Sequence, residues 1–156
     1  MEFSVYENKN FGFKIKYPES WELLDEHPLY AAAFLSPYEK NTKYRAEIII
    51  NVIDLSENKK TFDELKQMAP SQLKAFLNDF EIHGQIDTIL GGKKAFQIIY
   101  SGKMKFGRQK DLDLKYFQVS TLLDNVFYQI AYSHGPKFYL ESFPFVKKMI
   151  ESFEFT

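Results

Sequence analysis

Three histidines are the first residues to consider for metal binding or acid–base chemistry. His27, His83 and His134 lie far apart in the sequence, and none has a second histidine or a cysteine at metal-ligand spacing. The chain has no cysteine, which excludes a thiol nucleophile, a cysteine-bound zinc ion and an iron–sulfur cluster. The sequence therefore contains neither an HExxH zinc motif nor any cysteine chemistry.

Two pairs of residues could contribute ligands to a weakly bound divalent metal. Glu26 and His27 are adjacent, and Asp111 and Asp113 are two residues apart, so that the two aspartates can share one face of a strand. Neighbouring residues on a strand point to opposite faces, which argues against the first pair. Calcium takes about six to eight oxygen ligands, which argues against the second. An ordinary solvated loop is the alternative at both places.

Two further motifs invite a catalytic or phosphate-binding interpretation. Ser133-His134-Gly135 places a hydroxyl beside an imidazole, but sequence neighbours reach triad geometry only through a special turn, and no G-x-S-x-G motif is present. Gly91-Gly92 followed by Lys93-Lys94 resembles part of a phosphate loop, but a strand follows it and the required spacing is missing. We therefore predict no catalytic residue, no cofactor and no enzymatic activity.

A basic stretch from Lys103 to Lys110 is the preferred contact region for a partner. Its candidate residues are Lys103, Lys105, Phe106, Arg108 and Lys110. An exposed loop of this composition could dock an acidic protein or a membrane surface. A plain solvated loop is the alternative, because Asp111 and Asp113 offset its charge. The aromatic residues Tyr38 and Tyr44 form a second candidate region.

The overall charge and hydropathy narrow the classes of partner. Lys and Arg number 20 against 21 Asp and Glu, and no long single-sign run occurs, so we expect no nucleic-acid binding. The longest apolar stretch, residues 30–35, is far shorter than the roughly 18 residues of a transmembrane segment. We expect a soluble chain, cytoplasmic if Met1 is the native start and extracytoplasmic if a leader was removed. Peripheral membrane association is compatible with this composition.

Alternating residues on both sides of Asp124-Asn125 predict a β-hairpin over residues 117–132. If Leu123 faces Val126, one face is apolar, and the other, mostly polar face is expected nearer water. Period-two patterns predict further strands at residues 3–6, 11–17, 21–24, 31–35, 46–55, 80–90 and 93–100. The strand at 46–55 is apolar on both faces, so we expect it in the middle of the sheet.

Two helices are predicted from capping and periodicity. The segment Thr61 to Glu64 has the form of a capping box and begins a helix that continues to Phe80, with a kink or break near Ala69 because Pro70 cannot donate a backbone hydrogen bond. A second helix follows Gly135-Pro136, with Pro144 in its first turn. Its buried stripe comprises Phe143, Val146, Ile150 and Phe153.

The turn at Gly91-Gly92 sets the register of the two strands around it. A two-residue loop would place Phe96 opposite Asp87 and so mix apolar with polar neighbours. A three-residue loop with a bulge places Thr88 by Phe96 and Ile86 by Ile98, so we predict that arrangement. The order of strands, helix, strands and helix predicts an α+β fold built on an antiparallel sheet, as one domain over residues 1–156.

Several segments together resemble one family. Gly12 to Pro18 followed by Trp21 resembles the first strand and turn of the PsbP-like family. Gly92 to Phe96 leading to Tyr100 is similar to that family's central hairpin, and Phe145 to Phe153 resembles its C-terminal helix. The resemblance spans essentially the whole chain. It implies an antiparallel sheet flanked by helices on both faces, an αβα sandwich, and a non-enzymatic role.

Members of this family in oxygenic phototrophs are extrinsic lumenal subunits of photosystem II, and relatives elsewhere are often secreted or lipid-anchored. The sequence lacks the long N-terminal segment of the photosystem subunits, which argues against a role in water oxidation. We therefore expect a non-catalytic binding or assembly domain that engages a protein partner through loop and sheet-edge surfaces. The alternative is a carrier of a small apolar ligand or a weakly bound divalent metal, held in a cleft between sheet and helix.

Overall fold

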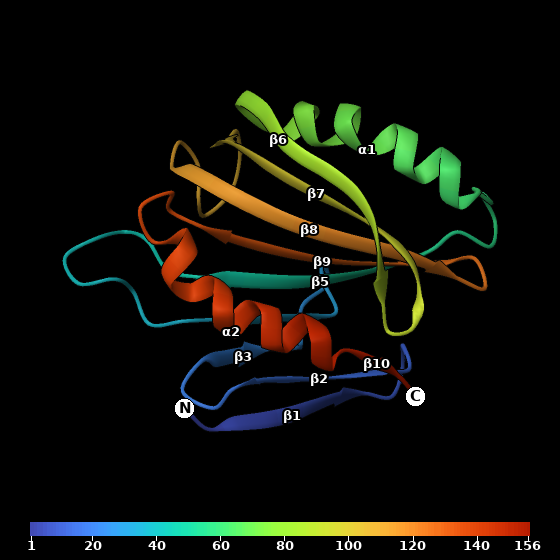
Figure 1. The fold of residues 1–156 in the computed structure, drawn as a ribbon, viewed down its shortest axis with the longest axis horizontal. Helices are drawn as coiled ribbons and strands as arrows, with labels where there is room; N and C mark the ends of the chain where they lie inside the picture. The colour runs from blue at the N-terminus through green and yellow to red at the C-terminus, as the bar shows by residue number, and fades with distance from the viewer.

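The computed structural model describes all residues from Met1 to Thr156 and contains two antiparallel sheets and two helices (Figure 1). The larger sheet has seven strands in the order β3-β4-β5-β9-β8-β7-β6. Their bounds are β3 Glu22–Leu24, β4 Ala32–Leu35, β5 Glu47–Asp54, β6 Leu77–Leu90, β7 Lys93–Met104, β8 Asp113–Leu123 and β9 Val126–His134. The smaller sheet comprises β1 Phe3–Asn8, β2 Phe13–Pro18 and β10 Glu154–Phe155. The helices are α1 Phe62–Phe76 and α2 Tyr139–Ser152.

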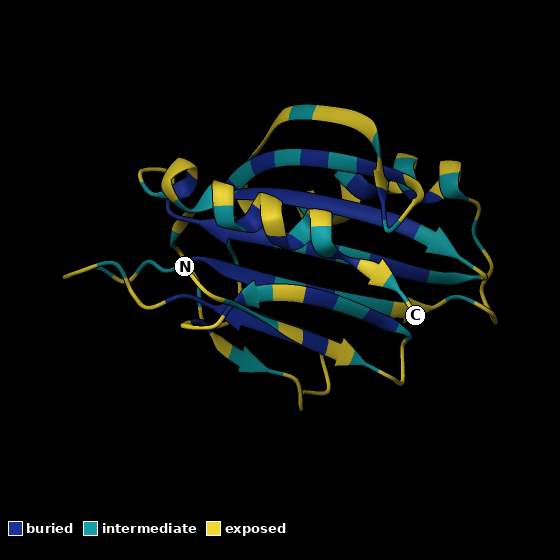
Figure 2. Cartoon of the chain, turned by 60° about the horizontal axis from the view of Figure 1, so that its bottom comes forward, coloured by how far each residue is buried: buried dark blue, intermediate teal, exposed yellow.

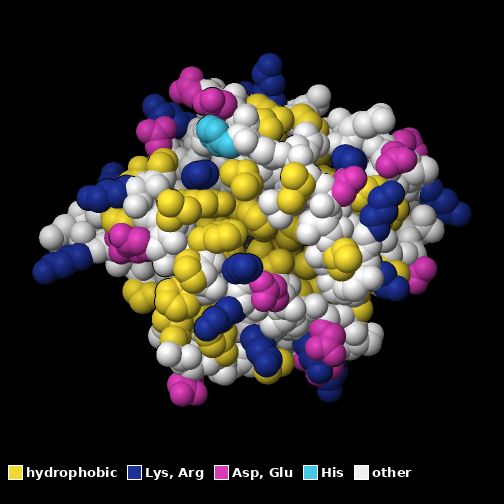
Figure 3. All heavy atoms as spheres, viewed as in Figure 1, with side chains coloured by type: hydrophobic (Ala, Val, Ile, Leu, Met, Phe, Trp, Pro, Cys, Tyr) yellow, Lys and Arg dark blue, Asp and Glu magenta, His cyan; other side chains and the backbone are white.

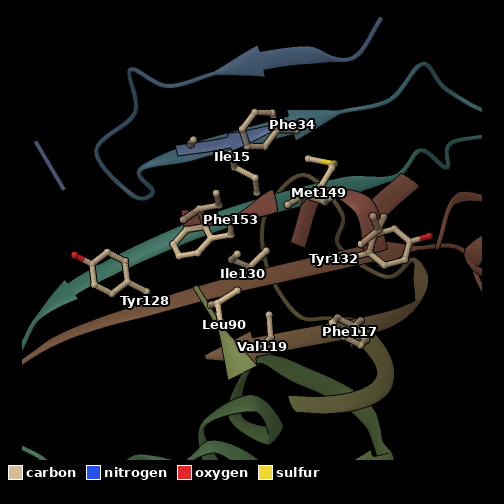
Figure 4. Close-up of a cluster of buried hydrophobic side chains, with 14 of the residues drawn as sticks. Ile15, Phe34, Leu90, Phe117, Val119, Tyr128, Ile130, Tyr132, Met149 and Phe153 are labelled. Atoms are coloured by element: carbon tan, nitrogen blue, oxygen red, sulfur yellow. The ribbon is translucent and has the colours of Figure 1, made fainter. Parts of the chain in front are cut away.

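The two helices lie on opposite faces of the larger sheet (Figure 1). On one face, Leu65 and Ala69 of α1 share a cluster of buried residues with Phe96 of β7. On the other face, α2 and the smaller sheet together cover a larger core, part of which is drawn in Figure 4. The predicted antiparallel sheet flanked by helices on both faces is therefore confirmed.

The hairpin of β8 and β9 forms as predicted. Leu123 pairs with Val126, and the pairing continues in register along both strands. Asp124 and Asn125 both adopt left-handed backbone conformations, with φ of 50° and 62°, as a type I′ turn requires. Asn and Asp tolerate this conformation better than other non-glycine residues, so the turn residues themselves specify the register.

The second face of this hairpin does not lie near water, which corrects the prediction. Tyr116, Ser120 and Phe127 on that face are all buried, and Figure 2 shows long buried stretches along the strands of the larger sheet. Tyr116 and Phe127 belong to the cluster beneath α1. The polar residues of the strands suggested an open face, but Gln118 is buried with its amide oxygen accepting from the Tyr100 hydroxyl at 3.0 Å. The hydroxyls of Tyr116 and Ser120 are buried without a hydrogen-bond partner. The prediction for β5 is confirmed, because it lies between β4 and β9.

Helix α1 begins with the predicted capping box, but it differs from the prediction farther along. The Thr61 hydroxyl accepts from the backbone N–H of Glu64 at 3.1 Å, and the Glu64 carboxylate accepts from the N–H of Thr61 at 3.0 Å. The helix continues through Pro70 without a break, although Pro70 has no N–H to donate to the carbonyl of Lys66. The burial of Leu65 and Ala69 stabilises this part of the helix. It ends at Phe76 rather than Phe80, because β6 starts pairing with β7 at the next residue.

The turn between β6 and β7 also corrects a prediction. It is a two-residue Gly91-Gly92 turn, with φ of 59° and 77°, and it places Asp87 opposite Phe96. The predicted register kept apolar residues next to one another, but β6 is an edge strand of the sheet and does not need an apolar neighbour at every position. Its isoleucines can therefore remain exposed, and Asp87 forms an ion pair with Lys66 of α1 at 2.7 Å.

Helix α2 forms where it was predicted, and Val146 and Met149 are buried in its interface with the sheet. It begins at Tyr139, so Pro144 lies inside the helix rather than in its first turn. Because Pro144 has no N–H, the carbonyl of Leu140 lacks its usual hydrogen-bond donor. The side chain of Leu140 is exposed, so water can reach this side of the helix.

Candidate functional site

Three segments gather at one end of the larger sheet, on the left in Figure 1. We call this region the loop end and define it as residues 36–46, 103–113 and 134–140. These segments join β4 to β5, β7 to β8, and β9 to α2. The second segment contains all five residues predicted to contact a partner.

The loop between β7 and β8 is fixed in place by a buried carboxylate. Glu47, the first residue of β5, has only 3% of its side chain exposed. Arg108 donates from Nη2 to Glu47 Oε1, and Gln109 donates from Nε2 to Glu47 Oε2. Gly107 allows the sharp bend with φ of 86°. Arg108, predicted as a contact residue, thus contacts the protein's own core, and Glu47 was not identified from the sequence.

The other predicted contact residues remain on the surface of this loop. Phe106 is 66% exposed, and Lys110 is also exposed. Lys105 is half-buried, and its backbone N–H donates to the carbonyl of Phe76 at the end of α1, at 3.0 Å. Lys103 forms an exposed ion pair with Asp113 at 4.0 Å. The loop therefore presents an aromatic ring among lysines.

The segment between β4 and β5 is fixed by a buried imidazole. His134 is fully buried, and its Nε2 lies 3.1 Å from Oε1 of Glu39. Its Nδ1 accepts from the backbone N–H of Gly135 at 2.8 Å, so the neutral tautomer with a proton on Nε2 fits both contacts. Burial lowers the pKa of His134 below 6.5, and the nearby Glu39 opposes this shift. Neither nitrogen contacts a serine hydroxyl.

The loop end combines positive charge with exposed apolar side chains. Its three segments contain eight Lys or Arg residues and three carboxylates, although the whole chain has a net charge of −1. Tyr38, Phe106 and Leu140 are all more than half exposed. The Arg45 guanidinium lies 4.4 Å from the centre of the Tyr38 ring.

The residues considered as metal ligands are exposed. His27 accepts from the N–H of Leu29 through Nδ1 at 3.0 Å and stacks on Tyr30, with 4.2 Å between the ring centres. Glu26 is exposed beside it, Asp111 is exposed, and Asp113 is the ion-pair partner of Lys103. No group of three or more His, Asp or Glu side chains in the structure is placed to hold a metal ion.

A cleft of about 870 Å³ lies between α2 and the β6–β7 side of the larger sheet. Figure 3 shows it as a hollow among hydrophobic side chains near the middle of this face. Its apolar lining comprises Ile89, Ile99, Phe117, Phe143, Ile150, Phe153 and Phe155. Gly91 closes one end, because a Cβ atom there would lie 2.9 Å from the Phe155 ring. Isoleucines on the edge strand β6 are exposed, so part of the sheet is uncovered, but the sequence pattern did not predict which residues line the cleft.

The antiparallel sheet and the two helices on its opposite faces define an α+β sandwich. A family model described as PsbP-like protein matches residues 1–155, and the chain belongs to the PsbP-like family. No curated protein matches the sequence. No helix of the structure is long and apolar enough to cross a membrane.

Several solved structures share this fold at low sequence identity. LpqN of Mycobacterium tuberculosis, involved in cell envelope biogenesis, is 16% identical with a TM-score of 0.71, over 99% of this chain and 91% of that one. Cyanobacterial PsbP of Synechocystis is 13% identical with a TM-score of 0.66, over 99% and 92%. The Ran-binding protein Mog1p of Saccharomyces cerevisiae is 13% identical with a TM-score of 0.66, over 99% and 96%. At these identities the likeness shows the fold.

Proposed function

We propose that this chain is a non-catalytic binding domain that engages a protein partner through the loop end. The observation that carries this proposal is the exposed Phe106 on a loop whose shape is fixed by the contacts of Arg108 and Gln109 with buried Glu47. A loop that only connects two strands does not need contacts with a buried carboxylate to fix its shape. A loop that presents a defined binding surface needs a fixed shape.

The Glu47 contacts are costly to form, which supports a role beyond stability. Removing a carboxylate from water costs several kcal/mol, and a paired, buried charge is often no more stabilising than an apolar residue of the same size. What the pairing with Arg108 supplies is a single loop conformation. A loop that is already rigid loses less conformational entropy when a partner binds, so its affinity is higher.

The composition of the loop end indicates the chemistry of the partner. Aromatic residues and arginine are enriched at protein interfaces, and Phe106, Tyr38 and Arg45 supply these groups here. The excess of positive charge favours a partner with an acidic surface and would speed its association. That the same fold occurs in a Ran-binding protein supports a protein-binding role.

The test compares paired variants in a pull-down from the source cells. The substitutions Phe106→Ala and Lys105→Glu change the loop end and leave the Glu47 contacts intact. The matched control, Phe11→Ala with Lys9→Glu, makes the same chemical changes at the turn between β1 and β2, where Phe11 is also exposed. We expect a partner bound by the wild type and the control to be lost from the loop-end variant. A partner retained equally by all three proteins would exclude the loop end as its binding surface.

A further inference from the structure

The cleft between α2 and the β6–β7 side of the sheet has polar side chains along part of its sheet wall. Lys93 and Gln97 alternate along β7 on the same face of the sheet, and Thr88 of β6 lies opposite Ala95 between them. These three polar side chains therefore form a row along one wall. The facing wall comes from α2 and the residues after it, and it combines the apolar side chains of Phe143, Ile150 and Phe153 with the charged residues Lys147, Glu151 and Glu154.

The polar row has no partner within the protein. The Gln97 amide and the Thr88 hydroxyl are half-buried and make no hydrogen bond to another protein group. The carboxylates of the lining are already paired, Glu151 with Lys147 at 3.8 Å and Glu154 with Lys14 at 3.6 Å. Lys93 has no carboxylate within ion-pair distance, and it is the charged residue of the lining that remains uncompensated.

We propose that this cleft binds a small amphiphile with an anionic head group, such as a long-chain carboxylate. The apolar body of the ligand packs against Phe143, Ile150 and Phe153, while its head group accepts a charge-assisted hydrogen bond from Lys93. The volume of about 870 Å³ falls within the range of roughly 300–1,000 Å³ that is usual for small-molecule sites. This site is separate from the loop end and adds a ligand to the proposed protein-binding role.

The head-group preference follows from charge complementarity along the polar row. An anion near Lys93 gains a charge-assisted hydrogen bond, and a cation there is repelled. A neutral alcohol of the same chain length keeps the apolar contacts and loses only the charge interaction. The chain length and the head group can therefore be tested independently.

The test is a fluorescence titration of the full chain with 11-(dansylamino)undecanoic acid, followed by displacement with three twelve-carbon competitors. Dodecanoate and dodecyltrimethylammonium are used below their critical micelle concentrations, and dodecanol is used below its solubility limit. We expect dodecanoate to displace the probe at lower concentration than dodecanol, and dodecyltrimethylammonium to be the weakest. Lys93→Glu should weaken dodecanoate binding about ten-fold and leave dodecanol nearly unchanged. Lys59→Glu, an exposed lysine outside the cleft, is the matched control and should have no effect.

A second variant tests the apolar wall and the location of the site. Ile99→Trp fills the cleft floor and should abolish binding of all three competitors, while Phe106→Ala at the loop end should change none of them. Three results would each overturn the proposal: no saturable binding of the dansylated probe, equal displacement by all three head groups, or the same affinity in Lys93→Glu as in the wild type. The Lys93 result is decisive if Ile99→Trp fails to fold, because Lys93 is exposed and lies beside a turn.

Discussion

At the scale of single residues, the contact between Arg108 and Glu47 holds the candidate binding loop. Glu47 is almost fully buried at the start of β5, and Arg108 is half exposed in the loop that crosses over it. The side chain of Gln109 binds the second carboxylate oxygen. The sequence indicated the basic stretch but not this contact, because the two partners are 61 residues apart and nothing in the local pattern of β5 marks Glu47 as buried.

Arg108→Ala should destabilise the protein more than the removal of a neighbouring lysine. The truncation leaves the Glu47 carboxylate buried with only Gln109 as partner, which we expect to cost about 1–3 kcal/mol. Lys105→Ala is the control, since Lys105 forms no ion pair, and it should cost less than about 0.5 kcal/mol. Urea denaturation at pH 7 measures both values. Equal values for the two variants would show that the Glu47 contact contributes nothing to holding the loop.

His134 should make stability depend on pH between neutral and mildly acidic conditions. Burial lowers its pKa in the folded state below the usual 6.5, so the unfolded chain binds more protons as the pH falls through this region. Its contribution to stability is therefore present above pH 6.5 and is lost as the pH falls below it. Protonation of Nδ1 would also remove the acceptor to which the backbone N–H of Gly135 donates.

The comparison of wild type with His134→Gln isolates this effect. The wild type should lose more of its free energy of unfolding between pH 7.5 and pH 5.5 than the variant does, as measured by urea denaturation at each pH. The carboxylates titrate mainly below this range and are common to both proteins. Parallel pH profiles would contradict the assignment of a lowered pKa to His134.

At the scale of elements, the two glycines of the turn between β6 and β7 allow the cost of backbone strain to be measured separately from the cost of a steric clash. Gly91 and Gly92 both adopt positive φ, but only Gly91 packs against the Phe155 ring. Gly92→Ala should cost about 1–2 kcal/mol from backbone strain alone. Gly91→Ala should cost more, because Phe155 must also move. Thermal denaturation of the two variants gives the difference, and equal melting temperatures would show that β10 does not pack firmly on the turn.

Elements were predictable from the sequence where local residues fix their geometry. The hairpin of β8 and β9 has its register set by Asp124 and Asn125, and the start of α1 is set by Thr61 and Glu64, so both were correct. The turn at Gly91 was wrong because its register depends on whether β6 is covered, which is a property of the whole sheet. The end of α1 was missed for the same reason, since pairing of β6 with β7 overrides helix periodicity.

At the scale of the whole molecule, the sandwich separates two surfaces. The loop end lies where β7 and β9 finish, whereas the cleft lies between α2 and the sheet and includes the Gly91-Gly92 turn at the opposite end of β7. The resemblance to the PsbP-like family predicted the layers correctly. A cleft between sheet and helix was expected only for the alternative function, a carrier of a small apolar ligand, and the sequence did not indicate where such a cleft lies. Its existence depends on how far α2 extends across the sheet, and the periodicity of a helix specifies its buried face but not its position.

In the whole molecule, the loop end is the surface that we propose binds a protein partner. The direct measurement is hydrogen–deuterium exchange of the full chain, alone and with a purified partner that the wild type retains in the pull-down. We predict protection in residues 36–46, 103–113 and 134–140, and a loss of this protection in the variant with Phe106→Ala and Lys105→Glu. Protection confined to the outer face of α1 or to the edge of β6, with the loop end unchanged, would contradict the claim.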